Sequence, residues 1–219
     1  MASKILTVTE QIYRELRDEI LDHRIPPGEK LTIKMLHERY GVSSSPIREA
    51  LAHLQQDGLI NYKPNIGMRV VEMTPKDMEE LFTLMAELDA IAVRFAMKSE
   101  RRDEMLEKLR KLRDEGNEFV ENDIDGYLGV SEDFHLLFYE YADNSRLADA
   151  AGKIRMQFSL FSRVYQKEPH NQKEIHEQHQ AVINAVLNGD VEEASLLMRQ
   201  HVQSSRCKAL HVIQNENEQ

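Results

Sequence analysis

One short segment, residues 59–72 (LINYKPNIGMRVVE), interrupts a chain whose other apolar patterns are helical. Ile60 and Tyr62 precede the turn sequence KPNIG, and Met68 and Val70 follow it. Apolar residues on both sides of a Pro/Asn/Gly turn indicate two paired strands. The segment is therefore predicted to be a small β-hairpin, and the helices around it define the fold class.

Three helices are predicted before this hairpin. Residues 7–23 carry apolar side chains at a spacing of four with charges between them, which indicates an amphipathic helix. The next segment, RIPPGEKL, contains two prolines and a glycine and is predicted to be a turn. Thr32 is expected to cap a short second helix that Gly41 ends. The third helix ends near Gly58, and its apolar positions follow the i, i+3, i+4, i+7 pattern: Ile47, Ala50, Leu51 and Leu54.

The chain is predicted to be helical after the hairpin. Thr74 is a suitable N-cap, with Pro75 at the first helical position. The first of these helices shows an apolar stripe at Leu81, Leu84, Leu88, Ile91 and Phe95. The expected helices are 75–99, 102–121, 124–142, 146–167, 172–188 and 190–213. The fold class is thus mainly α, with a winged helix-turn-helix domain (1–73) and an all-helical antiparallel bundle of about six helices (74–219).

Amino-acid composition supports the mainly helical fold class and indicates the cellular compartment. Aromatic residues make up only 6% of the 219 residues and Trp is absent, whereas good helix formers are plentiful. Cys207 is the single cysteine, so no intrachain disulfide can form. With no secretory signal and no run of about eighteen apolar residues, we expect a cytoplasmic protein that does not cross a membrane.

Charge is unevenly distributed along the chain. Residues 1–72 hold ten basic and ten acidic side chains out of totals of 28 and 38, which leaves 18 basic and 28 acidic for the remainder. The formal net charge of -10 therefore arises after residue 72. This balance argues against non-specific polyanion binding by the C-terminal part and leaves the N-terminal part open.

The third helix has a composition suited to close approach to DNA. Its sequence, GVSSSPIREAL, makes Ser43 the expected N-cap, with Ser44 and Ser45 opening the helix. The N-terminal end of a recognition helix enters the major groove, where hydroxyls and backbone N–H groups reach phosphates. Arg48 lies one turn further on the same side, and arginine is the usual bidentate reader of guanine. Taken alone, this segment is equally compatible with a plain capped helix.

The order PPGEKL, GVSSSPIREAL, DGLI and KPNIGMRVV resembles the GntR family of bacterial transcription regulators over about residues 8–72. The family commonly has an arginine at the position of Ser44, and related regulators often place a basic DNA-contacting residue at that of Lys34. Arg69 is either a wing contact or a solvated strand charge, and Glu49 is expected to hold a neighbouring helix. The resemblance implies this DNA-binding set: Lys34, Ser43, Ser44, Ser45, Arg48, Gly67 and Arg69.

The remainder resembles the FCD-type module of the FadR subfamily, in its VanR-like group, over about residues 75–212. Many members bind a divalent metal through an Asp or Asn and three histidines. The segments SEDFHLLFYEYADN, EQHQAVINAV and MRQHV match that pattern, and the resemblance implies the ligands His135, His179 and His201. The position of the family's Asp is occupied by Ser131. Three alternatives follow from this replacement. Water completes the three-histidine site, Glu132 completes it, or metal binding at the site is weakened.

The residues support a metal site independently of the resemblance. His179 and His201 share helix faces with apolar residues, so they are expected to point inward. Neutral imidazole nitrogens are good ligands for Zn or Ni, and three from separate helices can converge in a bundle core. The alternative is three core histidines that are separately hydrogen-bonded. His176 either supplements the site or lies at the surface.

The resemblance further implies a pocket beside the metal for a small effector, often a carboxylate. The family's arginine on the first bundle helix is replaced here by Met85, although Asp89 matches its acid. Arg155 and Arg163 are candidate anion partners or solvated helix charges, and Phe138 and Tyr139 are expected in the core. The candidate effector pocket comprises Ser131, Glu132, Met85, Arg155, Arg163 and His176.

The predicted function is that of a sequence-specific transcriptional regulator, a repressor, and not an enzyme. It is expected to bind near-palindromic double-stranded operator DNA as a homodimer. An organic acid or other metabolite in the metal-containing bundle would modulate this binding. Two alternatives remain: the ion itself is the signal, or the chain is a metal-dependent hydrolase. HEQH at 176–179 differs in spacing from the zincin HExxH motif, which argues against the hydrolase.

Overall fold

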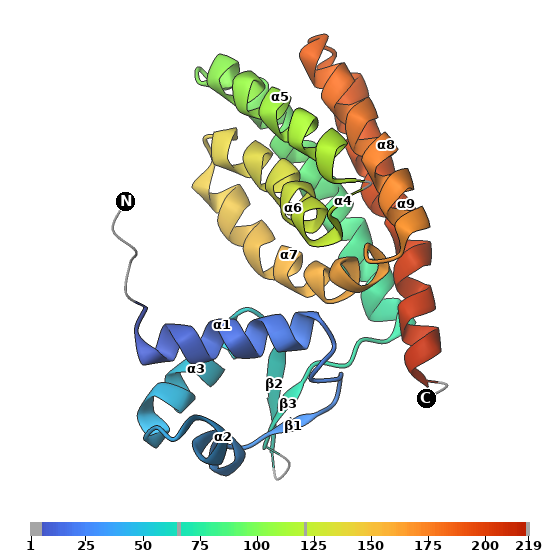
Figure 1. The fold of residues 1–219 in the computed structure, drawn as a ribbon. Coiled ribbons are helices and arrows are strands. Elements are labelled where there is room, and N and C mark those ends of the chain that lie inside the picture. Colours follow the sequence, from blue (N-terminus) through green and yellow to red (C-terminus); the bar gives the residue numbers. More distant parts are fainter. Residues whose placement is uncertain (1–5, 65–66, 121, 218–219) are drawn as a thin grey trace. The chain divides into compact units, whose positions relative to one another are not determined.

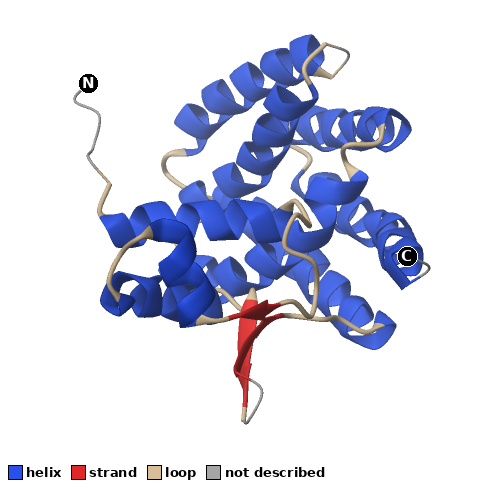
Figure 2. Ribbon diagram, turned by 60° about the horizontal axis from the view of Figure 1, so that its bottom comes forward, coloured by secondary structure: helices blue, strands red, loops and turns tan. Residues whose placement is uncertain are grey.

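The computed structural model describes residues 6–64, 67–120 and 122–217, with side chains up to residue 211. The chain divides into two compact units, Met1–Thr74 and Pro75–Gln219. Over the described residues it contains nine helices and three short strands (Figures 1 and 2). None of the helices in these ranges is long and apolar enough to cross a membrane. The predicted mainly helical fold class is confirmed.

The first unit combines three helices with a three-stranded antiparallel sheet of order β1-β3-β2. The sequence predicted only two strands. In the structure, Lys30 and Leu31 form a third strand, which pairs with Arg69 and Met68 of β3. A two-residue strand is too short to show an alternating pattern, so it was read as part of the turn. The elements are α1 (Val8–Leu21), β1 (Lys30–Leu31), α2 (Ile33–Tyr40), α3 (Ser44–Gln56), β2 (Ile60–Lys63) and β3 (Gly67–Val70).

Local capping explains where the helices of this unit begin and end. The Thr32 hydroxyl accepts a hydrogen bond from Met35 N at 3.1 Å, as expected of an N-cap. Gly41 ends α2 with φ of 66°, a left-handed conformation that favours glycine. Ser43 occupies the N-cap of α3 without a side-chain capping bond, which leaves its hydroxyl available. Part of the predicted hairpin turn, residues 65–66, lies outside the described residues.

The second unit is a six-helix bundle, and its predicted boundaries hold to within a few residues. Helix α9 lies alongside both α4 and α8, and α5 lies against α6 (Figure 1). Helix α8, the fifth helix of the bundle, begins at Pro169 rather than at the predicted residue 172, because Pro169 fits the first turn after the N-cap Glu168. The helices are α4 (Pro75–Ala96), α5 (Arg102–Phe119), α6 (Ile124–Tyr141), α7 (Ser145–Tyr165), α8 (Pro169–Leu187) and α9 (Val191–Asn217).

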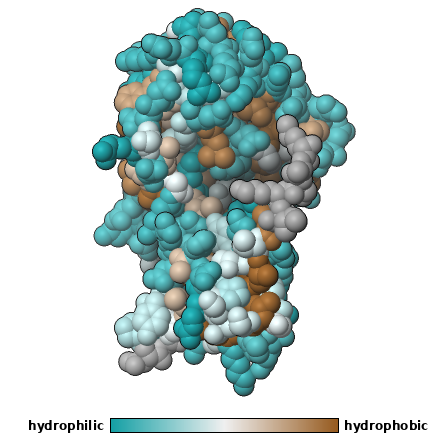
Figure 3. All heavy atoms as spheres, turned by 90° about the vertical axis from the view of Figure 1, so that its left-hand side faces the viewer, coloured by the Kyte–Doolittle hydropathy of each residue, from teal (hydrophilic) through white to brown (hydrophobic). Residues whose placement is uncertain are grey.

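The apolar stripe predicted for α4 is only partly the buried face. Leu81 is buried, but Leu84 and Phe95 are 47% and 38% exposed. The buried face instead combines alanines with larger apolar side chains such as Phe82 and Met85. Alanines on this face permit close helix packing. The predicted stripe omits them because it was based on the largest apolar residues alone. On the face drawn in Figure 3, hydrophobic residues form small patches among largely hydrophilic ones.

Candidate nucleic-acid interface and metal centre

The N-terminal end of α3 presents small polar residues and one unpaired cation. Ser44, Ser45 and Arg48 are exposed, whereas Ile47 is fully buried beneath them. Within the described residues, Arg48 forms no ion pair. Glu49 is held instead by Thr9 of α1, whose hydroxyl donates to its carboxylate at 3.1 Å. The acid beside Arg48 thus fastens α3 to α1, as expected, and leaves the guanidinium available to an external anion.

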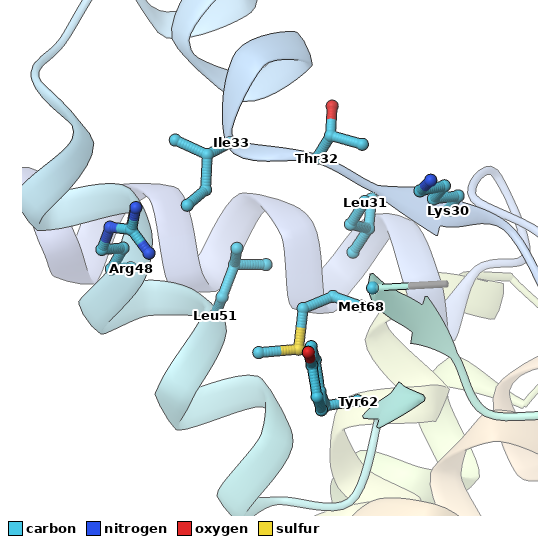
Figure 4. A pocket seen from close by; sticks show the side chains of 9 residues that line it. Lys30, Leu31, Thr32, Ile33, Arg48, Leu51, Tyr62 and Met68 are labelled. Atoms are coloured by element: carbon cyan, nitrogen blue, oxygen red, sulfur yellow. The ribbon is translucent and has the colours of Figure 1, made fainter. Parts of the chain in front are cut away.

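An open hollow of about 500 Å³ lies between α3, the start of α2 and the strands (Figure 4). Its floor is apolar, with Leu51 and Met68 facing each other across it. Arg48 lies at one end and Lys30 at the other (Figure 4). The exposed Tyr62 also lines the hollow. Two cations at the ends of an apolar depression suit a sugar-phosphate backbone, which combines charge with an apolar ribose face.

The other predicted DNA-binding residues have varied surroundings. The Lys34 side chain is 85% exposed, and its Nζ lies 4.0 Å from a Glu38 oxygen, a pair that solvent weakens. Gly67 lines the hollow at the start of β3, with φ of 100°. Arg69, predicted either as a wing contact or as a solvated charge, is half-buried and has a partner within its own unit. Its guanidinium donates to the Gly28 carbonyl at 2.5 Å, so it ties the wing to the loop before β1.

The second unit brings its three predicted histidines together. His135 of α6, His179 of α8 and His201 of α9 are buried, and their candidate ligand atoms all lie within 4.8 Å of one another. The Nε2 atom of His201 lies 3.0 Å from that of His179 and 3.3 Å from that of His135. Phe134 stacks on the His179 ring with centroids 4.2 Å apart and fixes its plane.

Two of these histidines are neutral at neutral pH. Burial lowers the pKa of His179 well below its usual range, and the neighbouring rings of His201 and His135 lower it further. Burial also lowers the pKa of His201, with an added contribution from His135. Neutral imidazole is the form that binds transition metals, so the cluster does not need to lose protons at these two rings before an ion enters.

The spacing of the donor atoms fits a small divalent ion. With Zn–N bonds of 2.0–2.1 Å, two donors of a tetrahedral site lie about 3.3 Å apart. The Nε2 separations of 3.0 and 3.3 Å are close to this value. Three histidines and an open position also match the usual composition of exchangeable zinc sites. Two of the three donor separations thus suit zinc or nickel, and all three donor atoms lie within 4.8 Å of one another.

A buried charge network adjoins the cluster. Asp89 of α4 is 2% exposed, and its Oδ2 lies 2.8 Å from His135 Nδ1, although the N–H direction departs from that of a formal hydrogen bond. Arg155 of α7 approaches the other Asp89 oxygen at 3.1 Å, and the Tyr139 hydroxyl donates to it at 2.6 Å. Burial raises the pKa of Asp89, but the charge of Arg155 and the hydrogen bond from Tyr139 are among the contacts that outweigh this effect and hold it at about 2.

The predicted effector residues separate into different surroundings. Arg155 is not a solvated charge, because it lies buried between Asp89 and Glu132, whose Oε1 is 3.2 Å away. Glu132 thus pairs with Arg155, and it is not a member of the histidine cluster. His176 lies 3.0 Å from Asn117 Oδ1 of α5, outside the cluster. The remaining three divide by burial: Ser131 and Met85 are buried, and Arg163 is partly exposed.

Sequence reasoning missed three residues that the structure places at these sites. The sequence places Lys30 in the predicted turn RIPPGEKL, and its position at the edge of the hollow is not evident from the sequence. Asp89 was matched to a family acid, but its contact with His135 was not foreseen. Its signal was an acid within the buried face of α4. Gln178 was overlooked because it precedes His179 in a polar segment, yet its Oε1 lies 2.8 Å from His201 Nδ1.

Comparison with known families matches both units. The description "Bacterial regulatory proteins, gntR family" applies to residues 8–70, and the FCD domain to residues 80–204. Together these two matches include α3, the wing and all three clustered histidines. The predicted resemblance is confirmed for both parts of the chain.

Individual relatives agree with these matches. The HTH-type transcriptional repressor GlaR of Escherichia coli (strain K12) is 30% identical over 201 residues, covering 87% of this chain and 90% of that protein. The regulator YdhC of Bacillus subtilis (strain 168) is 30% identical over 139 residues, but the match spans only 63% of this chain and 62% of YdhC. The structure of E. coli McbR/YncC shares the fold, with a TM-score of 0.78 at 20% identity over 95% of this chain and all of that one.

Proposed function

Because the chain belongs to the gntR family of bacterial regulatory proteins and carries an FCD domain, we propose that it is a metal-containing repressor of transcription. It is a transcriptional regulator and not an enzyme, because the families that it matches and its relatives consist of transcriptional regulators. Repression is inferred by analogy with GlaR, which is a transcriptional repressor. The observation that carries the DNA-binding role is that Arg48 is exposed at the start of α3 and forms no ion pair with the part of the chain that the structure describes.

Arg48 is proposed to read a base, while Ser44, Ser45 and Lys30 contact phosphates around it. Replacing Arg48 by Ala is expected to weaken operator binding by about 1–3 kcal/mol, or roughly 5- to 150-fold, because a bidentate contact to guanine is lost. Gel shift with the DNA upstream of the protein's own gene measures this change. Lys111→Ala, an exposed cation on α5, serves as the control and should bind normally. Undiminished binding by Arg48→Ala would show that this residue reads no base.

A homodimer is proposed to place two such helices on a near-palindromic operator. The exposed stripe of α4 suits a contact with a second copy, since Leu84 and Phe95 lie three turns apart on one face. Leu88 and Ile91 are half-buried between them and complete the stripe. A symmetric pair of such faces would bury apolar surface that a single chain leaves in water.

A matched pair of charge substitutions tests this contact. Leu84→Lys is expected to convert the dimer largely to monomer in sedimentation velocity at micromolar concentration. Leu136 on α6 is similarly exposed, at 43% against 47% for Leu84, and Leu136→Lys should leave the dimer intact. If both variants remain dimeric, the stripe on α4 is not the dimer contact.

His135, His179 and His201 are proposed to hold a divalent ion, with zinc or nickel preferred by their nitrogen donors. When bound, such an ion supplies a Lewis-acid site for an anionic group and joins three helices of the bundle. Dialysis against a chelator, then against zinc, should give about one zinc per chain by elemental analysis. His201→Ala should abolish this retention, and equal retention by the variant would place the metal elsewhere.

The effector is proposed to be a small organic acid that contacts the ion. Arg155 already pairs with Asp89 and Glu132, so an incoming carboxylate relies on the metal for most of its attraction. A series of mono- and dicarboxylates of roughly two to six carbons should include one that weakens operator binding of the zinc-loaded protein only. If zinc alone changes operator affinity and none of these acids has an effect, the ion itself is the signal. For an acid to weaken operator binding, the acid and the operator must prefer different states of the dimer.

A further inference from the structure

We propose that Asp89 of α4 is the carboxylate that orients His135 for metal binding. This inference rests on the proposed metal site and concerns how its ligands are held. Asp89 acts as a positioning residue: it contacts the ring of a ligand and not the ion. The inference is carried by which atoms of the His135 ring face which neighbours.

The two nitrogens of His135 face opposite partners. Its Nε2 points to the cluster, 3.3 Å from His201 Nε2. Its Nδ1 lies 2.8 Å from Asp89 Oδ2. Since the two nitrogens occupy opposite edges of the imidazole ring, an acid at Nδ1 cannot also reach an ion held at Nε2. Asp89 is therefore in the outer position of a carboxylate–histidine–metal arrangement, a recurring feature of histidine metal sites.

An ionised acceptor at Nδ1 selects one tautomer. A carboxylate accepts hydrogen bonds only, so the His135 proton is most stable on Nδ1 and leaves the Nε2 lone pair free for an ion. A small rotation of the ring as an ion enters would align the N–H with Asp89. The same carboxylate raises the basicity of Nε2 and so strengthens the bond to the metal.

The surroundings of Asp89 fit it for this role. It is buried at 2% exposure and remains ionised through its contact with Arg155. The Tyr139 hydroxyl donates to Oδ1, and Arg155 donates to Oδ1 at 3.1 Å and to Oδ2 at 3.3 Å, so His135 Nδ1 shares Oδ2 with Arg155. Three elements therefore fix the carboxylate: α4 carries it, α6 supplies Tyr139 and α7 supplies Arg155. A fixed acceptor is what a metal ligand requires in order to be held in one orientation.

His201 is held in the same manner by a neutral acceptor. Its Nδ1 lies 2.8 Å from Gln178 Oε1. The Gln178 amide nitrogen donates to Glu174 at 3.0 Å, and the Ser204 hydroxyl donates to the Gln178 oxygen at 3.2 Å, which identifies that oxygen as the acceptor. Two of the three histidines thus have an acceptor at Nδ1 and a bare Nε2 directed at the cluster. This repetition favours a function in ligand orientation over an ion pair that only joins helices.

Metal affinity in matched variants tests the proposal. Zinc binding to the chelator-treated full-length protein is measured by competition with a chromophoric chelator. Asp89→Asn is expected to lower zinc affinity about 10- to 100-fold, because a neutral amide oxygen is a weaker acceptor than the carboxylate and does not raise the basicity of Nε2 to the same extent. Ser131→Ala, a buried neighbour at the family's acid position, should change affinity less than threefold. Asp89→Asn with wild-type affinity overturns the proposal, as does an equal loss in Ser131→Ala.

One further measurement makes the result decisive even if Asp89→Asn unfolds. Nitrogen NMR of ¹⁵N-histidine-labelled wild-type protein without metal should show His135 protonated on Nδ1 and bare at Nε2 at pH 7.5. The opposite tautomer overturns the role of Asp89 without the use of any variant. Wild-type protein that binds no zinc overturns the metal site itself, together with this role. Wild-type protein that binds zinc, with Asp89→Asn unchanged, overturns only the role of Asp89.

Discussion

Acid is expected to destabilise the metal-free protein well above the range in which carboxylates titrate, because of His179 and His201. In the folded protein burial lowers the pKa of both rings well below the usual value. In the unfolded chain each titrates near 6.5. Below that pH the unfolded state binds more protons than the folded state. The stabilising contribution is therefore complete above about pH 6.5 and is lost as the pH falls below it.

The size of the effect follows from these proton affinities. Between pH 7.5 and 5.5, each ring that stays neutral when folded lowers the free energy of unfolding by about 1.4 kcal/mol, or about 2.7 kcal/mol for both. Both rings are only 4–5% exposed, so solvent screening reduces this little. The assay is urea unfolding followed by circular dichroism at the two pH values, with a chelator present throughout.

Matched glutamine variants isolate the contribution of each ring. His179→Gln cannot titrate, so its loss between the two pH values should be smaller than that of the wild type by about 1.4 kcal/mol. His170→Gln replaces an exposed histidine on the same helix and should retain the full loss. The reasoning is refuted if His179→Gln and the wild type lose equal stability, because other groups would then carry the pH dependence.

Two further substitutions follow from local geometry, and both are measured by urea unfolding. Gly41→Ala should lower the free energy of unfolding by about 1–2 kcal/mol, because alanine is strained at φ of 66°. An added Cβ meets nothing within 4 Å, so no steric clash contributes to this loss. Gly41→Asn should cost less, and equal stability of all three proteins would remove this explanation. Tyr139→Phe should cost about 1.5–3 kcal/mol by removing a hydrogen bond to the charged Asp89. A loss below 0.5 kcal/mol, on the order of a surface substitution, would contradict that bond.

The sequence was sufficient for features that depend on local chemistry. Thr32 and Gly41 bound α2 as predicted, because a side-chain cap and a left-handed turn require particular residue types. The convergence of His135, His179 and His201 was predicted from the family resemblance, and for His179 and His201 also from helix faces that turn inward. Residue type and helical period are properties that a single sequence contains.

Features that depend on tertiary partners were missed. Lys30 and Leu31 form a strand only because β3 passes beside them. The buried face of α4 was misjudged at Leu84, since the positions of α6, α7 and α9 decide which side chains are covered. The contact of Asp89 with His135 joins residues on two helices whose mutual rotation no local pattern specifies.

The three clustered histidines also lie far apart along the chain, separated by up to 66 residues. An ion held among them would close loops that include α7 and α8, and so would reduce the conformational entropy of the unfolded chain in the way a disulfide does. In a chain whose only cysteine is Cys207, that cross-link would be reversible and would depend on the free concentration of metal. The lifetime of the regulator in the cell would then follow metal supply, through the rate at which unfolded chains are degraded, independently of any change at the operator.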